Sequence, residues 1–334
     1  MKEPIYHIIQ KSIRNGILPP GFSLPDDDSG ASSICWAPGA MDGVCIYHMQ
    51  HREPDADSLR QMSEALETAS NGNFPKAEVL FAAWTEKCRA VNVVNTLRNY
   101  IIDHEDELDT GNIFGFGVHL IRHSTNIECV KIGLELLTLF DTSNDILRKI
   151  ICRLGLYDEF TLFAVLNMLN WDDGNQYVFD LAKKVHGWGR IHAVPALKPE
   201  TDEIKHWLLT EGTINDVDNA YSALLCWEKS DAETILFGNP STEEYKGISR
   251  IIDGLISEGP VRGISAIENA ETVLLRFLEI SHNDSSYDLD RELISSINDW
   301  AASFEEPKTE IIKACGELLL NRSDSMNNNG QENE

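Results

Sequence analysis

The chain has 334 residues, of which 42% are hydrophobic, so it holds enough apolar side chains for a continuous core and is not a disordered protein. Its formal net charge of -26 argues against nucleic acid and anionic membrane surfaces as partners, because both are polyanions and repel an acidic protein at long range. The same charge favours a basic partner. The alternative is that the charge serves only solubility.

The cysteines and the termini indicate a reducing compartment. The seven cysteines are scattered and contain no C-x-x-C pair, which predicts reduced thiols rather than a disulfide framework. The N-terminus lacks the basic and apolar segments of a signal peptide, and no stretch approaches the roughly eighteen apolar residues of a membrane span. We therefore expect a cytoplasmic protein, in the simplest case a bacterial one.

The beginning of the chain differs from the rest. Residues 5–15 predict a short helix that a glycine ends. Residues 33–37 and 44–49 predict two short strands around a Gly-rich loop, and so a β-hairpin within a small α/β cap. Symmetric pairing would place Cys35 and Cys45 on opposite faces of this hairpin, which argues against a disulfide between them.

Helical periodicity dominates from residue 57 onwards. Pro75 stands at the start of one helix, where its missing N–H is harmless. The predicted helices span 57–70, 75–88, 92–104, 114–123, 127–140, 144–154, 157–169, 177–185, 190–197, 200–210, 217–229, 231–237, 243–257, 264–281, 289–304 and 308–321. We thus predict an N-terminal cap over 1–56, a helical domain over 57–322, and a polar, disordered tail over 323–334.

The helical domain resembles HEAT and armadillo repeats. Residues 126–209 follow the rhythm of paired short helices, and the segment Gly187-Trp188-Gly189-Arg190-Ile191-His192-Ala193-Val194 resembles the start of the second helix in a HEAT repeat. The resemblance covers about residues 113–237. It implies an all-α solenoid that binds other proteins through a concave helix face, and it assigns no functional residue. The alternative is an irregular helical globule.

The segment around Trp188 is also similar to uncharacterised bacterial helical proteins that are sometimes labelled limonene hydroxylase. A hydroxylase needs haem, flavin or non-haem iron to handle oxygen, and the sequence offers a place for none of these. The label therefore predicts no activity for this chain.

Trp188, Arg190 and His192 form the first candidate binding group. A Trp between two glycines is a costly choice for a simple loop, and the Arg and His side chains suit an anionic ligand or a carboxylate of a partner. The structural alternative is that Trp188 fills the seam between two repeats while Arg190 pairs with an acid.

His48 and His51 form a weak metal candidate, with Asp42 or Asp55 as further ligands. The H-x-x-H spacing occurs often by accident, and the end of a strand would direct the two rings apart. Two ordinary histidines explain the pattern equally well, so we predict no metal ion and no cofactor.

Two other patterns carry less information. His119 and His123 share one face of a helix, but Leu120 stands where a metalloprotease motif requires Glu. Residues 172–175 contain two aspartates and a glycine, yet they lack the alternating ligands and the closing Glu of a calcium loop. A position on the surface or in a groove is a sufficient explanation for the two histidines, and a turn between helices is sufficient for residues 172–175.

The sequence thus predicts an all-α helical-repeat stack with a small N-terminal α/β cap and no phosphate-binding or nucleophile motif. We expect a non-enzymatic interaction scaffold, or an inhibitor or immunity-type protein, whose acidic face binds a basic protein. The candidate binding residues are Trp188, Arg190, His192, Asp42 and His48. The alternative is an enzyme with a pocket between the hairpin unit and the first repeats, using Asp42, His48 and His51. A deep pocket joining Asp42 and His48 to Trp188 or Arg190 would favour the enzyme.

Overall fold

The computed structural model describes residues 2–25, 36–50, 54–259, 261–284 and 286–329. Helices dominate this part of the chain, and within it the only β feature is an isolated bridge between Arg14 and Ile17. The prediction of a mainly helical protein is confirmed. Contacts divide the chain into unit 1, Met1–Leu197, and unit 2, Lys198–Glu334, and this boundary lies inside the helical domain predicted over 57–322.

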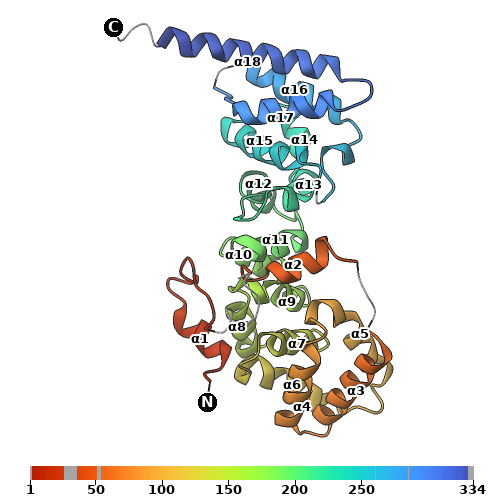
Figure 1. Cartoon of the computed structure of the whole chain (residues 1–334). Helices are drawn as coiled ribbons and strands as arrows, with labels where there is room; N and C mark the ends of the chain where they lie inside the picture. Colours follow the sequence, from red (N-terminus) through yellow and green to blue (C-terminus); the bar gives the residue numbers. More distant parts are fainter. Residues whose placement is uncertain (1, 26–35, 51–53, 260, 285, 330–334) are drawn as a thin grey trace. The chain divides into compact units, whose positions relative to one another are not determined.

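Unit 1 places successive helices side by side. α5 contacts α7, α7 contacts α9 and α9 contacts α11, so these four helices form one row, while α6 and α8 lie against it (Figure 1). The helices of this unit are α1 Ile5–Ser12, α2 Ala40–Tyr47, α3 Ala56–Ser70, α4 Phe74–Thr85, α5 Ala90–Asp103, α6 Thr110–His123, α7 Ile127–Leu137, α8 Asp145–Leu154, α9 Asp158–Met168, α10 Gly174–Ala182 and α11 Gly187–Ala193, followed by a 3-10 turn at Val194–Ala196.

Unit 2 packs in the same manner with two rows. One row runs through α13, α15 and α17, and the other through α14, α16 and α18. The helices are α12 Asp202–Thr210, α13 Ala220–Lys229, α14 Ala232–Phe237, α15 Thr242–Ile256, α16 Ala270–Asn283, α17 Arg291–Ala302 and α18 Thr309–Asn329, with a 3-10 turn at Ile264–Ala266. Within the described residues, no helix combines the length and the apolar character needed to cross a bilayer.

Side-chain caps explain why many helices begin where the sequence predicts. Asp55 accepts a hydrogen bond from the N–H of Ser58 at the start of α3, and Asn126 does the same for Cys129 at the start of α7. Ser241 and Glu244 form a reciprocal capping box at α15. Local chemistry therefore fixes these boundaries without help from tertiary contacts.

The predicted hairpin is wrong in its second strand. Residues 44–47 belong to helix α2, and the first predicted strand lies mostly in residues 26–35, outside the described residues. α2 begins after Gly39, whose φ of 77° is a left-handed conformation that glycine adopts at low cost. Val44 and Ile46 favour strands by propensity, but tertiary packing against unit 1 decides in favour of the helix.

The helix predicted over 190–197 begins earlier than expected, because α11 starts at Gly187 and includes both glycines around Trp188. A Cβ atom on Gly189 would stand 2.5 Å from Oδ1 of Asp158 and 2.8 Å from Oγ1 of Thr161. Gly189 therefore lets α11 approach α9 closely, and its role is packing rather than chain breaking.

The C-terminal helix also differs from prediction. α18 extends to Asn329, whereas the last helix predicted from the sequence ends at residue 321. Extension is inexpensive once the packed residues Ile311 and Leu318 have nucleated the helix, since each added residue gains one hydrogen bond. The six cysteines within the described residues are free thiols, and Cys35 lies outside them.

A tight contact in unit 2 gives a first prediction. A Cβ atom on Gly247 of α15 would stand 2.4 Å from the carbonyl oxygen of Leu209 in α12. Because backbone cannot move aside, we expect Gly247→Val to lower the free energy of unfolding by about 1–3 kcal/mol, measured by urea denaturation. Gly316→Ala is the control, since no atom lies within 4 Å of its new Cβ. It should stabilise α18 by about 0.5–1 kcal/mol, and equal effects of the two changes would contradict the prediction.

Candidate functional site

A cluster of five charged side chains lies inside unit 1. Lys131 is fully buried, and its Nζ lies 2.6 Å from Oδ2 of Asp42 and 2.5 Å from Oε2 of Glu159. The same Nζ lies 3.1 Å from Oε1 of Glu128. Arg89 reaches Asp42 at 3.2 Å and Glu128 at 3.0 Å. Two cations therefore face three carboxylates, and we call these five residues the charge cluster.

The charge cluster connects four helices. Its members come from α2, α7, α9 and the residue that precedes α5. Two of the carboxylates also accept backbone hydrogen bonds: Glu128 from the N–H of Ala90 at 2.7 Å, and Glu159 from the N–H of Gly39 at 2.8 Å. These bonds satisfy donors at the starts of α5 and α2, so the cluster positions both helices on the row.

Burial and charge act in opposite directions on these groups. Burial alone would lower the pKa of Lys131, but the surrounding carboxylates raise that pKa above its ordinary value. Burial alone would raise the pKa of Glu159, but the attraction of Lys131 and the hydrogen bonds to this carboxylate together lower that pKa. For Asp42 burial prevails, and its pKa is raised. Lys131 is therefore a permanent cation at the centre of the cluster.

The structure brings Trp188 and His192 close to the charge cluster. A Cβ atom on Gly43 would stand 2.1 Å from Cζ3 of Trp188, so α2 passes directly over this ring. His192 is 5% exposed, and burial lowers its pKa to about 4, with Lys131 contributing. Its Nε2 has no hydrogen-bond partner. His192 is therefore neutral at neutral pH.

Arg190 and His48 occupy other surroundings. Arg190 is 5% exposed, and its Nε donates to the carbonyl of Val185 at 3.0 Å. His48 is exposed just after the end of α2, and His51 lies outside the described residues. The described part of the chain contains no group of three or more His, Cys, Asp or Glu side chains that could hold a metal ion. The binding roles of Trp188, Arg190, His192 and His48 stay predictions.

The two weaker sequence patterns have local partners. Nε2 of His119 lies 3.0 Å from Oε2 of Glu78, and the rings of His119 and His123 lie 5.4 Å apart on the same face of α6. In the predicted turn, Asp173 precedes α10 and pairs with Arg148 at 2.9 Å. Both arrangements are explained by packing between neighbouring helices.

The sequence analysis missed Lys131, Glu128 and Glu159. A usable signal existed, because α7 reads as an apolar segment that contains a lysine and two glutamates. Charged groups inside a helix that is buried on nearly every side must be paired. That rule indicates partners for Lys131, but it does not name them.

A second candidate site lies on unit 2. A cavity of 500 Å³ has a mixed lining, in which Leu224, Trp227 and Ile267 supply apolar side chains and three glutamates supply negative charge. We call it the Trp227 cavity. Its described lining residues include no Lys or Arg. The remaining lining residues are Glu228, Glu233, Ala266, Glu268 and Asn269. The site thus combines a few apolar side chains with negative charge and no positive charge among its lining residues.

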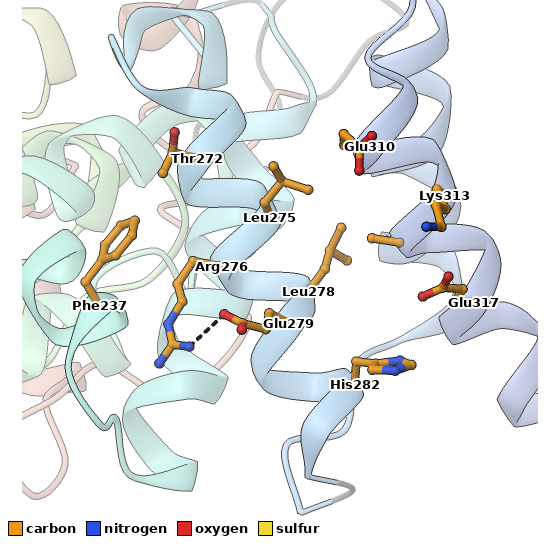
Figure 2. A pocket seen from close by; sticks show the side chains of 11 residues that line it. Phe237, Thr272, Leu275, Arg276, Leu278, Glu279, His282, Glu310, Lys313 and Glu317 are labelled. Atoms are coloured by element: carbon orange, nitrogen blue, oxygen red, sulfur yellow. Dashed lines mark hydrogen bonds and ion pairs between the residues drawn. The ribbon is translucent and has the colours of Figure 1, made fainter.

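A further cavity of 480 Å³ lies between α16 and α18 and carries charges of both signs (Figure 2). Arg276 is paired with Glu279 at 2.8 Å, and α18 contributes Lys313 beside Glu310 and Glu317. Since acids and bases alternate around this cavity, it favours neither charge in a ligand. The Trp227 cavity is the more selective of the two.

The acidic residues are concentrated in the same unit. Unit 2 holds 28 of the 54 Asp and Glu residues of the chain but only 11 of the 28 Lys and Arg residues. The field of this unit therefore attracts cations toward the Trp227 cavity from a distance. Comparison with protein-family models, with curated proteins and with solved structures found no match for this chain.

Proposed function

We propose that this protein is a non-enzymatic, cytoplasmic interaction scaffold of the helical-repeat type, and that its acidic surface binds a basic segment of another protein. The repeat architecture is supported by the rows in both units, because each helix of a row packs on the next helix of that row, two positions further along the chain. An inhibitor or immunity-type protein is one form of this function, because it would use the same acidic surface.

The Trp227 cavity is the observation that carries the proposal. A Lys or Arg side chain has an aliphatic stem and a charged head. Its stem would lie on Leu224 and Ile267, while its head would meet Glu228, Glu233 or Glu268. A basic peptide segment therefore matches both halves of the cavity lining.

The enzyme alternative has less support from the residues that were assigned to it. Asp42 is paired with Lys131 and Arg89, and Trp188 occupies the space beneath Gly43. His48 is exposed after the end of α2 rather than directed to a shared pocket with Asp42. Asp42 and Trp188 thus belong to a packed contact between helices.

The proposal predicts a local effect of charge removal. The probe is a fluorescent synthetic peptide of Lys and Arg interspersed with Gly and Ser, titrated at low salt and followed by anisotropy. Changing Glu228, Glu233 and Glu268 together to Gln should weaken binding about tenfold, since each exposed pair contributes about 0.2–1 kcal/mol. Added salt should weaken the wild-type complex mainly through slower association.

A matched variant separates the cavity from the general acidity of the protein. Asp216→Asn, Glu305→Gln and Glu306→Gln together remove the same charge from exposed positions that line neither cavity described above. This control should keep nearly the wild-type affinity. If both triple variants lose the same affinity, binding follows the general acidity of the protein and the Trp227 cavity is not the site. If salt has no effect, the acidic surface is only a solubility device. Either result contradicts the proposal.

A further inference from the structure

Helix α2 is attached to unit 1 unlike its neighbours. Its buried residues are Ala40, Asp42 and Gly43, so it buries no large apolar side chain, and Ile46 on its outer side is 44% exposed. α7, by contrast, buries nine of its eleven residues. The apolar side chains of α2 itself therefore contribute little to its attachment beyond the contact of Gly43 with the ring of Trp188, because the hydrophobic effect scales with the apolar area removed from water.

Specific polar contacts and close approach hold α2 instead. Asp42 lies between Lys131 and Arg89, and the N–H of Gly39 donates to Glu159. Gly43 permits contact with the ring of Trp188. Tyr47, one turn later, lies with its ring centroid 6.3 Å from that of Trp188. These contacts require a carboxylate, then a glycine, then an aromatic residue four positions further on.

The face beneath α2 is electrically complete without it. Lys131 keeps Glu128 and Glu159 as partners, and Arg89 keeps Glu128, so two cations would face two carboxylates. Removing α2 therefore exposes a site in which the two cations are balanced by two carboxylates, and no unpaired charge remains. Burying ion pairs yields a small net gain because desolvation offsets the attraction, so the ion pairs by themselves hold α2 only weakly.

α2 has little helical stability of its own. It has eight residues, contains a glycine, and begins without a side-chain cap. Isolated helices of fewer than about 12 residues are marginal in water, and an internal glycine costs about 1 kcal/mol. The segment therefore becomes helical as it docks, which is how a peptide ligand behaves on a receptor.

We propose that the face formed by α5, α7, α9 and α11 is a helix-binding site, with α2 as its intramolecular occupant. Its partner is a short helical segment of another protein. This segment presents a carboxylate, a glycine directly after the carboxylate, and an aromatic residue four positions after the glycine. The charge cluster makes the site selective for a carboxylate, since Lys131 and Arg89 together bind one carboxylate in addition to Glu128 and Glu159. This site differs from the Trp227 cavity, whose charge suits basic segments.

The test compares binding of a labelled peptide of residues 36–50 to variants of the full chain. Gly43→Val undocks α2 by a clash with Trp188, and Asp42→Lys undocks it by repulsion from Lys131 and Arg89. Both variants should bind the wild-type peptide at least tenfold more tightly than the wild-type chain does, because α2 no longer competes. Ile46→Ala, on the exposed side of α2, should behave like wild type.

Peptide variants test the recognition itself. Peptides carrying Asp42→Lys or Gly43→Val should lose binding to both undocked chains, whereas a peptide carrying Ile46→Ala should keep it. Absence of wild-type peptide binding to the undocked chains overturns the proposal, as does equal binding of the Asp42→Lys peptide. If both undocked chains lose the circular-dichroism signal of a folded helical protein, α2 is an integral part of the fold, and the proposal is likewise wrong.

Discussion

Replacing Lys131 with Met is expected to lower the free energy of unfolding by about 3–5 kcal/mol, the usual cost of removing one partner from a buried ion pair. Lys131 is fully buried and contacts Asp42, Glu128 and Glu159. Met fills a similar volume without the charge, so three carboxylates would remain close together with only Arg89 to balance them. Urea denaturation followed by far-UV circular dichroism measures the effect.

Two further variants establish why Lys131→Met loses stability. Lys76→Met removes an exposed lysine from α4, and it should change stability by less than about 0.5 kcal/mol. Adding Asp42→Asn and Glu159→Gln to Lys131→Met should recover at least half of the loss, because the neutral side chains no longer repel one another. A loss no larger than that of the Lys76 control would show that the cluster is solvated, and failure of the rescue would point to packing instead of charge.

Glu135→Gln is expected to stabilise the protein above pH 7 and to have a smaller effect at pH 5. Glu135 on α7 is 1% exposed, and burial raises its pKa to about 7 against the attraction of Arg98. Its Oε1 accepts a hydrogen bond from Arg98 at 3.0 Å, while its Oε2 is buried without a partner. Ionisation of this carboxyl is therefore costly in the folded state.

The direction of the pH effect follows from proton binding. Between pH 4.5 and about 7, the folded chain keeps the proton of Glu135 and the unfolded chain releases it. The stability contributed by this group is therefore complete below pH 4.5 and is lost as the pH rises through 7, by about 3 kcal/mol in total. Gln cannot ionise, so the stability difference between the variant and wild type should grow by about 1–3 kcal/mol from pH 5 to pH 8.

Thermal or urea unfolding at a series of pH values measures this difference. Glu67→Gln is the control, since it removes the same chemical group from the exposed surface of α3. We expect its effect to vary with pH much less than that of Glu135→Gln. A Glu135→Gln difference that stays constant, or that shrinks as the pH rises, would mean that Glu135 is ionised throughout and stabilised by Arg98.

The sequence by itself determined the helical class and many of the boundaries. The predicted helix at 57–70 corresponds to α3, and the predicted helix at 243–257 corresponds to α15. These results depend on local physics. The apolar spacing of 3.6 residues selects the helix, and caps such as Asp55 and Ser241 set where it begins. The apolar spacing and the capping residues are each contained within a few neighbouring residues, so both can be recognised in the sequence without knowledge of the tertiary structure.

Tertiary structure alone decided α2 and the charge cluster. Residues 44–47 favour a strand by propensity, yet Glu159 binds Gly39 and Lys131 binds Asp42 in the folded chain, and the segment becomes a helix. These partners are separated by about ninety residues or more along the chain, since Asp42 pairs with a residue 89 positions away and Gly39 with one 120 positions away. A buried lysine implies that carboxylate partners exist. Only the packing of α2, α7 and α9 determines which carboxylates contact Lys131. Pairing between distant residues depends on the three-dimensional arrangement, so it leaves no local pattern in the sequence.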